Sequence, residues 1–73
     1  NDGAAAVLLM SEEKIKEKGL KPLAKIITHG DYATNPIDFS IAPALLIPRM
    51  LERANLKLSD ISLFELNEAF SLV

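Results

Sequence analysis

Residues 61–70 read ISLFELNEAF, and this stretch decides the fold class. Its first six residues form a run of period two in which Leu63 and Glu65 share one side, as in a short β-strand. Asn67 follows directly, and asparagine is a favoured N-cap of a helix, which residues 68–71 suit as a first turn. A polar side chain is therefore expected where a strand passes into a helix, the place where ligands bind in layered α/β folds.

Two more strands are predicted upstream. Residues 4–10, between Gly3 and Ser11, are seven consecutive apolar residues. This run is too short for an uncapped helix and is typical of a strand buried on both faces. Its three alanines are poor strand formers, so a helix stays open there. Residues 23–28 follow Pro22, are rich in Ile and predict the second strand.

A helix is predicted between these strands, over residues 11–19. Ser11 suits the N-cap, the acidic residues after it suit the positive end, and Gly19 suits the terminating position. Glu12 and Lys16 are spaced to pair one helical turn apart. Since Ile15 is nearly its only apolar residue, this helix is expected to face water.

A second helix is predicted over residues 42–55, where apolar side chains recur at helical spacing and Pro43 suits the first turn. Pro48 lacks a backbone donor, so we expect it either to kink this helix or to mark its real beginning. A loop over residues 33–40 precedes the helix. The resulting order of strand, helix, strand, helix, strand and helix predicts an α/β fold.

The composition predicts a chain that needs partners for burial. Of its 73 residues 49% are hydrophobic, yet it has no Cys, one His and apolar runs at both ends. A chain this short buries only about 60% of its unfolded surface, and no disulfide or metal-ligand spacing compensates. We therefore expect an internal segment of a longer polypeptide, poorly folded by itself.

Charge and hydropathy argue against two classes of partner. The formal net charge is −2, with Lys and Glu interspersed, so no basic face is expected to bind nucleic acid. The apolar run at residues 4–10 falls far short of the roughly 20 residues that a membrane-spanning helix needs. Neither nucleic acid nor a membrane is a predicted partner.

Chemistry-bearing residues are few. Asn67 is the one suggestive residue, because a fixed amide can donate a hydrogen bond to a substrate oxygen or to an ordered water. The structural interpretation is also open, in which Asn67 only caps a helix and Glu68 favours its positive end. His29 closes the second predicted strand and is assigned no catalytic role.

Four segments in order resemble the thiolase family. The motifs NDGAAA at residues 1–6 and NEAF at residues 67–70 are spaced as in that family. KPLAKI at residues 21–26 is similar to the strand that opens the thiolase C-terminal domain. PIDF at residues 36–39 and IAP at residues 41–43 are similar to a loop of mitochondrial acetoacetyl-CoA thiolases. The resemblance spans the whole chain and implies the layered αβαβα thiolase fold, with residues 1–20 ending the N-terminal domain and residues 21–73 starting the C-terminal domain.

The resemblance implies an acyltransferase that forms or cleaves acetoacetyl-CoA by Claisen chemistry. In the family one cysteine takes an acetyl group from acetyl-CoA, and a second cysteine deprotonates another acetyl-CoA, whose carbanion attacks the acyl-enzyme. The NEAF asparagine, here Asn67, holds a water that forms an oxyanion hole together with a histidine. Both cysteines and that histidine lie outside this segment, so the chain alone is expected to be inactive.

Phe39 and Phe70 are, by the same resemblance, apolar walls that bind the acyl group, although a core role for Phe70 is also open. The mitochondrial enzymes follow this Phe with Pro, whereas here Ser40 follows Phe39, which puts tolerance of a 2-methyl-branched substrate in doubt. Glu65 and Glu68 are expected to be structural, because a nearby carboxylate would repel a developing enolate.

Three other functions stay open: a degradative 3-ketoacyl-CoA thiolase for longer chains, a non-catalytic acyl-CoA or lipid-binding protein, and a free-standing interaction module. The resemblance implies acetyl-CoA and acetoacetyl-CoA as substrates and a homotetrameric parent in ketone-body or fatty-acid metabolism, mitochondrial with a cytoplasmic alternative. No cofactor is expected in the segment. Enzymes of the mitochondrial type use potassium, whose ligands are not identifiable here.

Overall fold

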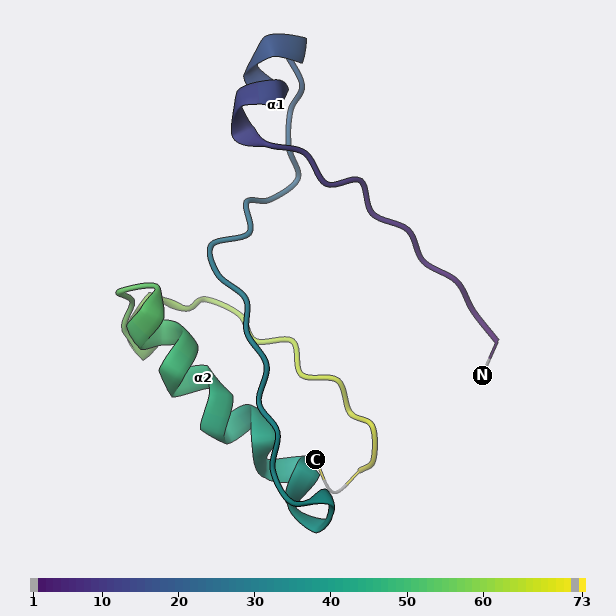
Figure 1. The fold of residues 1–73 in the computed structure, drawn as a ribbon, viewed down its shortest axis with the longest axis vertical. Helices are drawn as coiled ribbons and strands as arrows, with labels where there is room; N and C mark the ends of the chain where they lie inside the picture. Colours follow the sequence, from purple (N-terminus) through teal and green to yellow (C-terminus); the bar gives the residue numbers. More distant parts are fainter. Residues whose placement is uncertain (1, 72) are drawn as a thin grey trace.

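The chain forms an open structure built around two α-helices. A computed structural model describes residues 2–71 and residue 73, so that Asn1 of the NDGAAA motif and Leu72 lie outside the described residues. The elements follow the order α1 (Glu12–Lys18), the 3₁₀ helix η1 (Pro36–Ile41), α2 (Ala42–Arg53) and the 3₁₀ helix η2 (Leu58–Asp60). Figure 1 shows α1 at one end of the molecule and α2 at the other, joined by extended chain.

The predicted boundaries of α1 are confirmed at both ends. The Ser11 hydroxyl accepts a hydrogen bond from the backbone N–H of Lys14 at 3.2 Å, which satisfies one of the free donors of the first turn. Gly19 ends the helix in the left-handed region at φ 61°, and the N–H of Leu20 donates to the carbonyl of Ile15 at 3.0 Å. Local chemistry alone therefore suffices to delimit this helix.

The charged surface of α1 is exposed, as predicted. Lys16 Nζ lies 3.8 Å from Glu12 Oε1, one helical turn away, and Lys14 Nζ lies 2.8 Å from Glu17 Oε2. Lys25 reaches back from the following segment to Glu12 Oε2 at 3.1 Å. Exposed ion pairs of this kind each stabilise a structure by about 0 to 1 kcal/mol. They therefore contribute little to the position of α1.

The predicted second helix is confirmed, and α2 continues through Pro48. It begins at Ala42 with Pro43 in its first turn, so the interpretation of Pro48 as the real start is wrong. Pro48 removes one donor, yet both Pro48 and Ala44, whose carbonyl loses its partner, are exposed, so water can replace the bond. The helix ends at Arg53, and Asn55, two residues farther on, adopts φ 55°, a left-handed conformation that asparagine tolerates.

The strand predictions at residues 4–10, 23–28 and 61–66 are wrong for the described structure, and the helix alternative at residues 4–10 is wrong too. No β-strand forms among residues 2–71 and 73, where these three segments run as irregular extended chain. A strand exists only when its N–H and C=O groups pair with a neighbouring strand. The segments do not pair with one another, as Figure 1 shows for the N-terminal arm, which runs out alone. The described residues therefore do not confirm the predicted αβαβα layers.

The helix predicted after Asn67 is also absent from the described residues, where residues 69–71 form bends and a turn. A helix of one turn fixes several residues for a single hydrogen bond, so its nucleation is unfavourable without further turns to extend it. The predicted loop over residues 33–40 is more ordered than expected, since most of it belongs to η1.

The described residues contain no buried core. The radius of gyration is 15.9 Å, against about 11 Å for a compact domain of this length. The accessible surface of 7228 Å² likewise exceeds the roughly 4,500 Å² of a folded protein of this mass. Large apolar side chains such as Val7 and Leu23 are 85% and 106% exposed. Apolar surface of this extent requires cover from outside these 73 residues.

We expect the isolated 73-residue polypeptide to lack a cooperative unfolding transition, because no apolar core is lost when it unfolds. Differential scanning calorimetry should show no heat-absorption peak, and the chain should bind a hydrophobic dye or aggregate. The full-length protein that carries this chain, measured in the same buffer, should give a clear peak. A sharp transition in the isolated chain would contradict the absence of a core.

The left-handed cap of α1 generates a second expectation. Replacing Gly19 by Ala places a Cβ in open space, so any cost comes from the backbone conformation alone, about 1 kcal/mol. In the full-length protein, Gly19→Ala should lower the free energy of unfolding by that amount in a urea titration. Gly19→Asn, the matched control, should cost less because asparagine tolerates φ near +60°. Equal losses in the two variants would argue against the cap.

Candidate functional site

Two of the three predicted site residues lie against each other. The rings of Phe39 and Phe70 meet edge to face, with centroids 5.7 Å apart and planes at 74°. This geometry is favoured because the positive ring edge faces the negative ring surface. The contact joins the loop that carries Phe39 to the NEAF segment, which lies far away in the sequence. The two rings remain 45% and 65% exposed, so each has a free face.

The position of Phe39 is determined by its attachment to α2. Pro36 starts η1, and the N–H of Asp38 donates to the carbonyl of Asn35 at 2.8 Å. The Phe39 carbonyl accepts from the N–H of Ala42, the first residue of α2. Because η1 passes into α2 without a break, the Phe39 backbone moves with the helix.

Asn67 is exposed and stands three residues before Phe70. It begins no helix among the described residues, and its amide makes no side-chain hydrogen bond to another residue that the structure describes. The interpretation of Asn67 as a helix cap therefore has no support here. The exposed carboxamide can therefore hydrogen-bond to a polar partner from outside the chain.

Glu65 and Glu68 are both exposed on the segment that contains Asn67, and neither forms an ion pair with another described residue. His29 contributes a backbone contact instead of ring chemistry, since its carbonyl accepts a hydrogen bond from Arg53 Nη1 at 3.2 Å. The His29 backbone thereby ties the segment that precedes the Phe39 loop to α2.

A contact between Tyr32 and Arg49 was not expected from the sequence. The guanidinium carbon of Arg49 lies 4.8 Å from the centre of the Tyr32 ring, within the range of a cation–π interaction. The two residues belong to a loop and a helix with no fixed spacing between them. No periodic signal in the sequence could have identified the pair.

An open apolar groove runs along α2 on the side of the extended segments. Its walls are residues 26–28, the apolar residues of α2 from Leu46 to Ala54, and Ile61 with Phe64. The N-terminal arm and residues 20–26 flank a second open groove beside α1. The groove along α2 is lined almost entirely by apolar residues, whereas the groove beside α1 also includes the paired charges of Glu12, Lys16 and Lys25. We regard the groove along α2 as a packing surface.

Among the described residues, no group of three His, Asp or Glu side chains is arranged to hold a metal ion. No helix of the described part of the chain is both long and apolar enough to cross a membrane. Within the described residues, the predicted site residues offer a hydrogen-bonding amide at Asn67 and partly exposed rings at Phe39 and Phe70.

Comparison with known proteins confirms the family resemblance of the motifs. The model of the thiolase C-terminal domain matches residues 20–73. An acetyl-CoA acetyltransferase of Candida albicans is 62% identical over all 73 residues, and a probable acetyl-CoA acetyltransferase of Dictyostelium discoideum is 55% identical over the same length. A mitochondrial acetyl-CoA acetyltransferase of Bos taurus is 52% identical over the whole chain.

The chain spans less than a fifth of these relatives, 18% of the first two and 17% of the third. No solved structure matches it. The similarity nevertheless runs from the first residue to the last and includes both the PIDF and NEAF motifs. With a family match that covers most of its length, the chain belongs to the thiolase family.

Proposed function

We propose that this chain is a segment of an acetyl-CoA C-acetyltransferase that forms or cleaves acetoacetyl-CoA. The observation that carries the proposal is the identity of 52–62% along the entire chain to relatives that bear this name. The contact between Phe39 and Phe70 supports the assignment of these two residues to one site, and Asn67 stands three residues before Phe70 in the chain. Residues 1–20 would end the N-terminal domain and residues 21–73 start the C-terminal one, in keeping with the family match from residue 20.

In the proposed reaction Asn67 stabilises negative charge. A base removes a proton from the methyl group of acetyl-CoA, and the electron pair moves onto the thioester oxygen as an enolate. The Asn67 carboxamide holds a water whose O–H donates to that oxygen. The enolate carbon then attacks the acetyl thioester of the enzyme, a carbon–carbon bond forms, and the cysteine leaves as a thiolate. A donor fixed before the charge develops lowers the barrier most effectively.

The two phenylalanines would form the apolar wall beside the reacting carbon. Their edge-to-face contact leaves part of each ring exposed, and these free faces can pack against a short acyl chain. Neither ring brings a charge near the enolate. The base and the nucleophile must come from elsewhere in the protein, since the 73 residues contain no Cys.

The remaining parts of the proposal concern the full-length protein. We infer acetyl-CoA and acetoacetyl-CoA as its substrates, a homotetrameric assembly, a potassium requirement and a role in ketone-body or fatty-acid metabolism. Mitochondrial localisation is supported by relatives from Bos taurus and Xenopus laevis that are named mitochondrial, while other relatives carry no such word. A cytoplasmic enzyme is the alternative.

Replacing Asn67 by Ala should reduce kcat/KM for acetoacetyl-CoA cleavage by the full-length protein roughly 10²-fold or more, the usual loss for one oxyanion-hole donor. The reason is the loss of the bound water that stabilises the enolate. The matched control is Asn35→Ala, since Asn35 makes no side-chain capping hydrogen bond. Equal activity of Asn67→Ala and the parent, with folding intact, would remove Asn67 from the mechanism.

Replacing Phe39 by Ala should relax the limit on acyl length. Each methylene in an apolar pocket changes selectivity by about 10-fold or more, so the ratio of kcat/KM for 3-ketohexanoyl-CoA to that for acetoacetyl-CoA should rise by at least that factor. Phe64→Ala is the matched control, because Phe64 lines the groove beside α2. An unchanged ratio would remove Phe39 from the acyl wall.

The same assay separates the alternatives. A parent that prefers the longer substrate is a degradative 3-ketoacyl-CoA thiolase. A parent that binds acyl-CoA without any turnover is a thiolase-like binding protein.

A further inference from the structure

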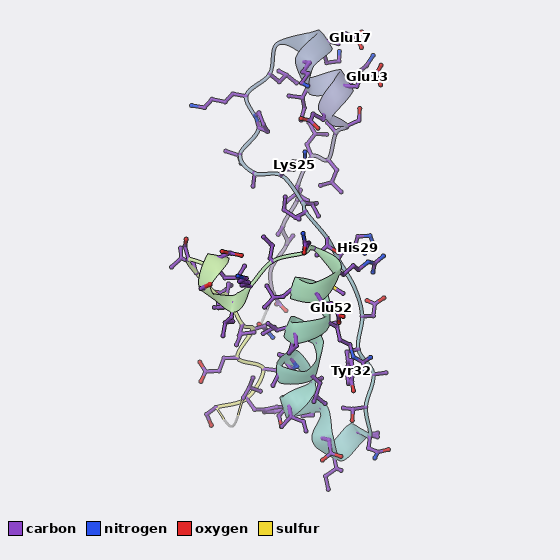
Figure 2. The ribbon with its side chains drawn as sticks, turned by 90° about the vertical axis from the view of Figure 1, so that its left-hand side faces the viewer. Glu13, Glu17, Lys25, His29, Tyr32 and Glu52 are labelled. Carbon is purple, nitrogen blue, oxygen red and sulfur yellow. The ribbon has the colours of Figure 1, made fainter. Side chains whose placement is uncertain are left out.

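Three contacts join residues 29–32 to α2. Arg53 Nη1 donates to the His29 carbonyl at 3.2 Å, and Arg49 lies 4.8 Å from the centre of the Tyr32 ring. Gly30 packs so closely on Met50 that a Cβ built at residue 30 would lie 2.7 Å from Met50 Cε. Figure 2 shows His29 and Tyr32 on the segment that runs beside α2. We call these contacts the 29–32 clamp.

The clamp holds one end of the loop that carries Phe39. The other end is η1, which passes directly into α2 at Ala42. Residues 33–41 therefore run from the clamp, which lies against the side of α2, to the first residue of the same helix. A loop whose two ends are attached to one rigid element has fewer conformations available than a loop attached at one end. The Phe39 ring extends from this doubly attached loop to Phe70.

We propose that Tyr32 and Arg49 are positioning residues that hold the Phe39 loop and thereby help to determine which acyl chains the enzyme accepts. The inference rests on the proposed thiolase activity. Tyr32 acts through its ring face and Arg49 through its charge, since the observed contact is guanidinium over ring. Neither residue touches the reacting atoms, so they act only through the placement of Phe39.

This assignment distinguishes the two side chains from ordinary packing. Phenylalanine at position 32 would keep the ring and hence the contact, whereas leucine would keep apolar bulk and lose it. Lysine at position 49 would keep the positive charge, whereas methionine would keep a side chain of similar length without the charge. If the two side chains acted by packing alone, both substitutions at position 32 would have the same effect on the loop, and so would both substitutions at position 49.

Hydrogen exchange followed by mass spectrometry tests the clamp itself in the full-length protein. Tyr32→Leu and Arg49→Met should each speed exchange of the peptide covering residues 33–41 by about 2- to 5-fold, the effect of losing an exposed cation–π contact. Tyr32→Phe and Arg49→Lys should restore slow exchange. The control variant Lys14→Met removes an exposed cation from α1 and should leave the exchange of residues 33–41 unchanged. Unchanged exchange in Tyr32→Leu and Arg49→Met would overturn the clamp whether or not the protein cleaves acetoacetyl-CoA.

Acyl selectivity tests the positioning role. In the same two variants the ratio of kcat/KM for 3-ketohexanoyl-CoA to that for acetoacetyl-CoA should rise about 2- to 5-fold, with Tyr32→Phe close to the parent. The double variant should show no more than the larger single effect, because both changes remove one contact. Faster exchange with an unchanged ratio in an active enzyme would overturn the positioning role. An inactive parent would refute the proposed thiolase activity, and the exchange result would still decide the clamp.

Discussion

The apolar face of α2 contacts the segments on either side of it. This contact organises the part of the molecule that surrounds α2, in the lower half of Figure 1. Residues 26–28 lie along one side of the groove, and Ile61 and Phe64 lie along another. Removal of apolar surface from water is the main favourable term in such packing, worth roughly 25 cal/mol per Å². Here that term is only partly realised, since every described residue keeps at least partial exposure. The helix nevertheless gives the segments before and after it a common support.

The same support brings the candidate site together. The chain enters along α2 through the 29–32 clamp, turns through η1 into the helix, and later returns to place Phe70 against Phe39. Asn67 lies on the returning segment with its amide free of described side-chain partners. The predicted site residues thus offer one exposed hydrogen-bonding amide and two partly exposed apolar rings.

Three extended segments remain exposed in a chain that spans less than a fifth of the length of its relatives. Residues 4–10, 23–28 and 61–66 have the apolar composition of buried strands and run without a ladder in this chain. Unpaired N–H and C=O groups remain with water here, and burying them would require partners. A thiolase of the length of the relatives has several times as many residues from which such partners can come. Among the described residues such partners are absent, because none of the three segments pairs with another.

The sequence by itself determined the elements whose stabilising contacts are local. Ser11, Gly19 and the i, i+4 pair of Glu12 and Lys16 act within one or two turns, so α1 could be predicted at both ends. The spacing of apolar residues likewise predicted α2, and the motifs predicted the family. Asn67, Phe39 and Phe70 could be named from those motifs without any knowledge of their distances.

Only the tertiary structure decided what depends on residues far apart in the chain. The Phe39–Phe70 contact and the Tyr32–Arg49 pair have no fixed sequence spacing. The three predicted strands failed because strand formation depends on hydrogen-bond partners that a segment's own residues do not supply. Helical hydrogen bonds close within four residues, whereas the bonds of a sheet require a second segment, and this difference separates what the sequence could determine from what it could not.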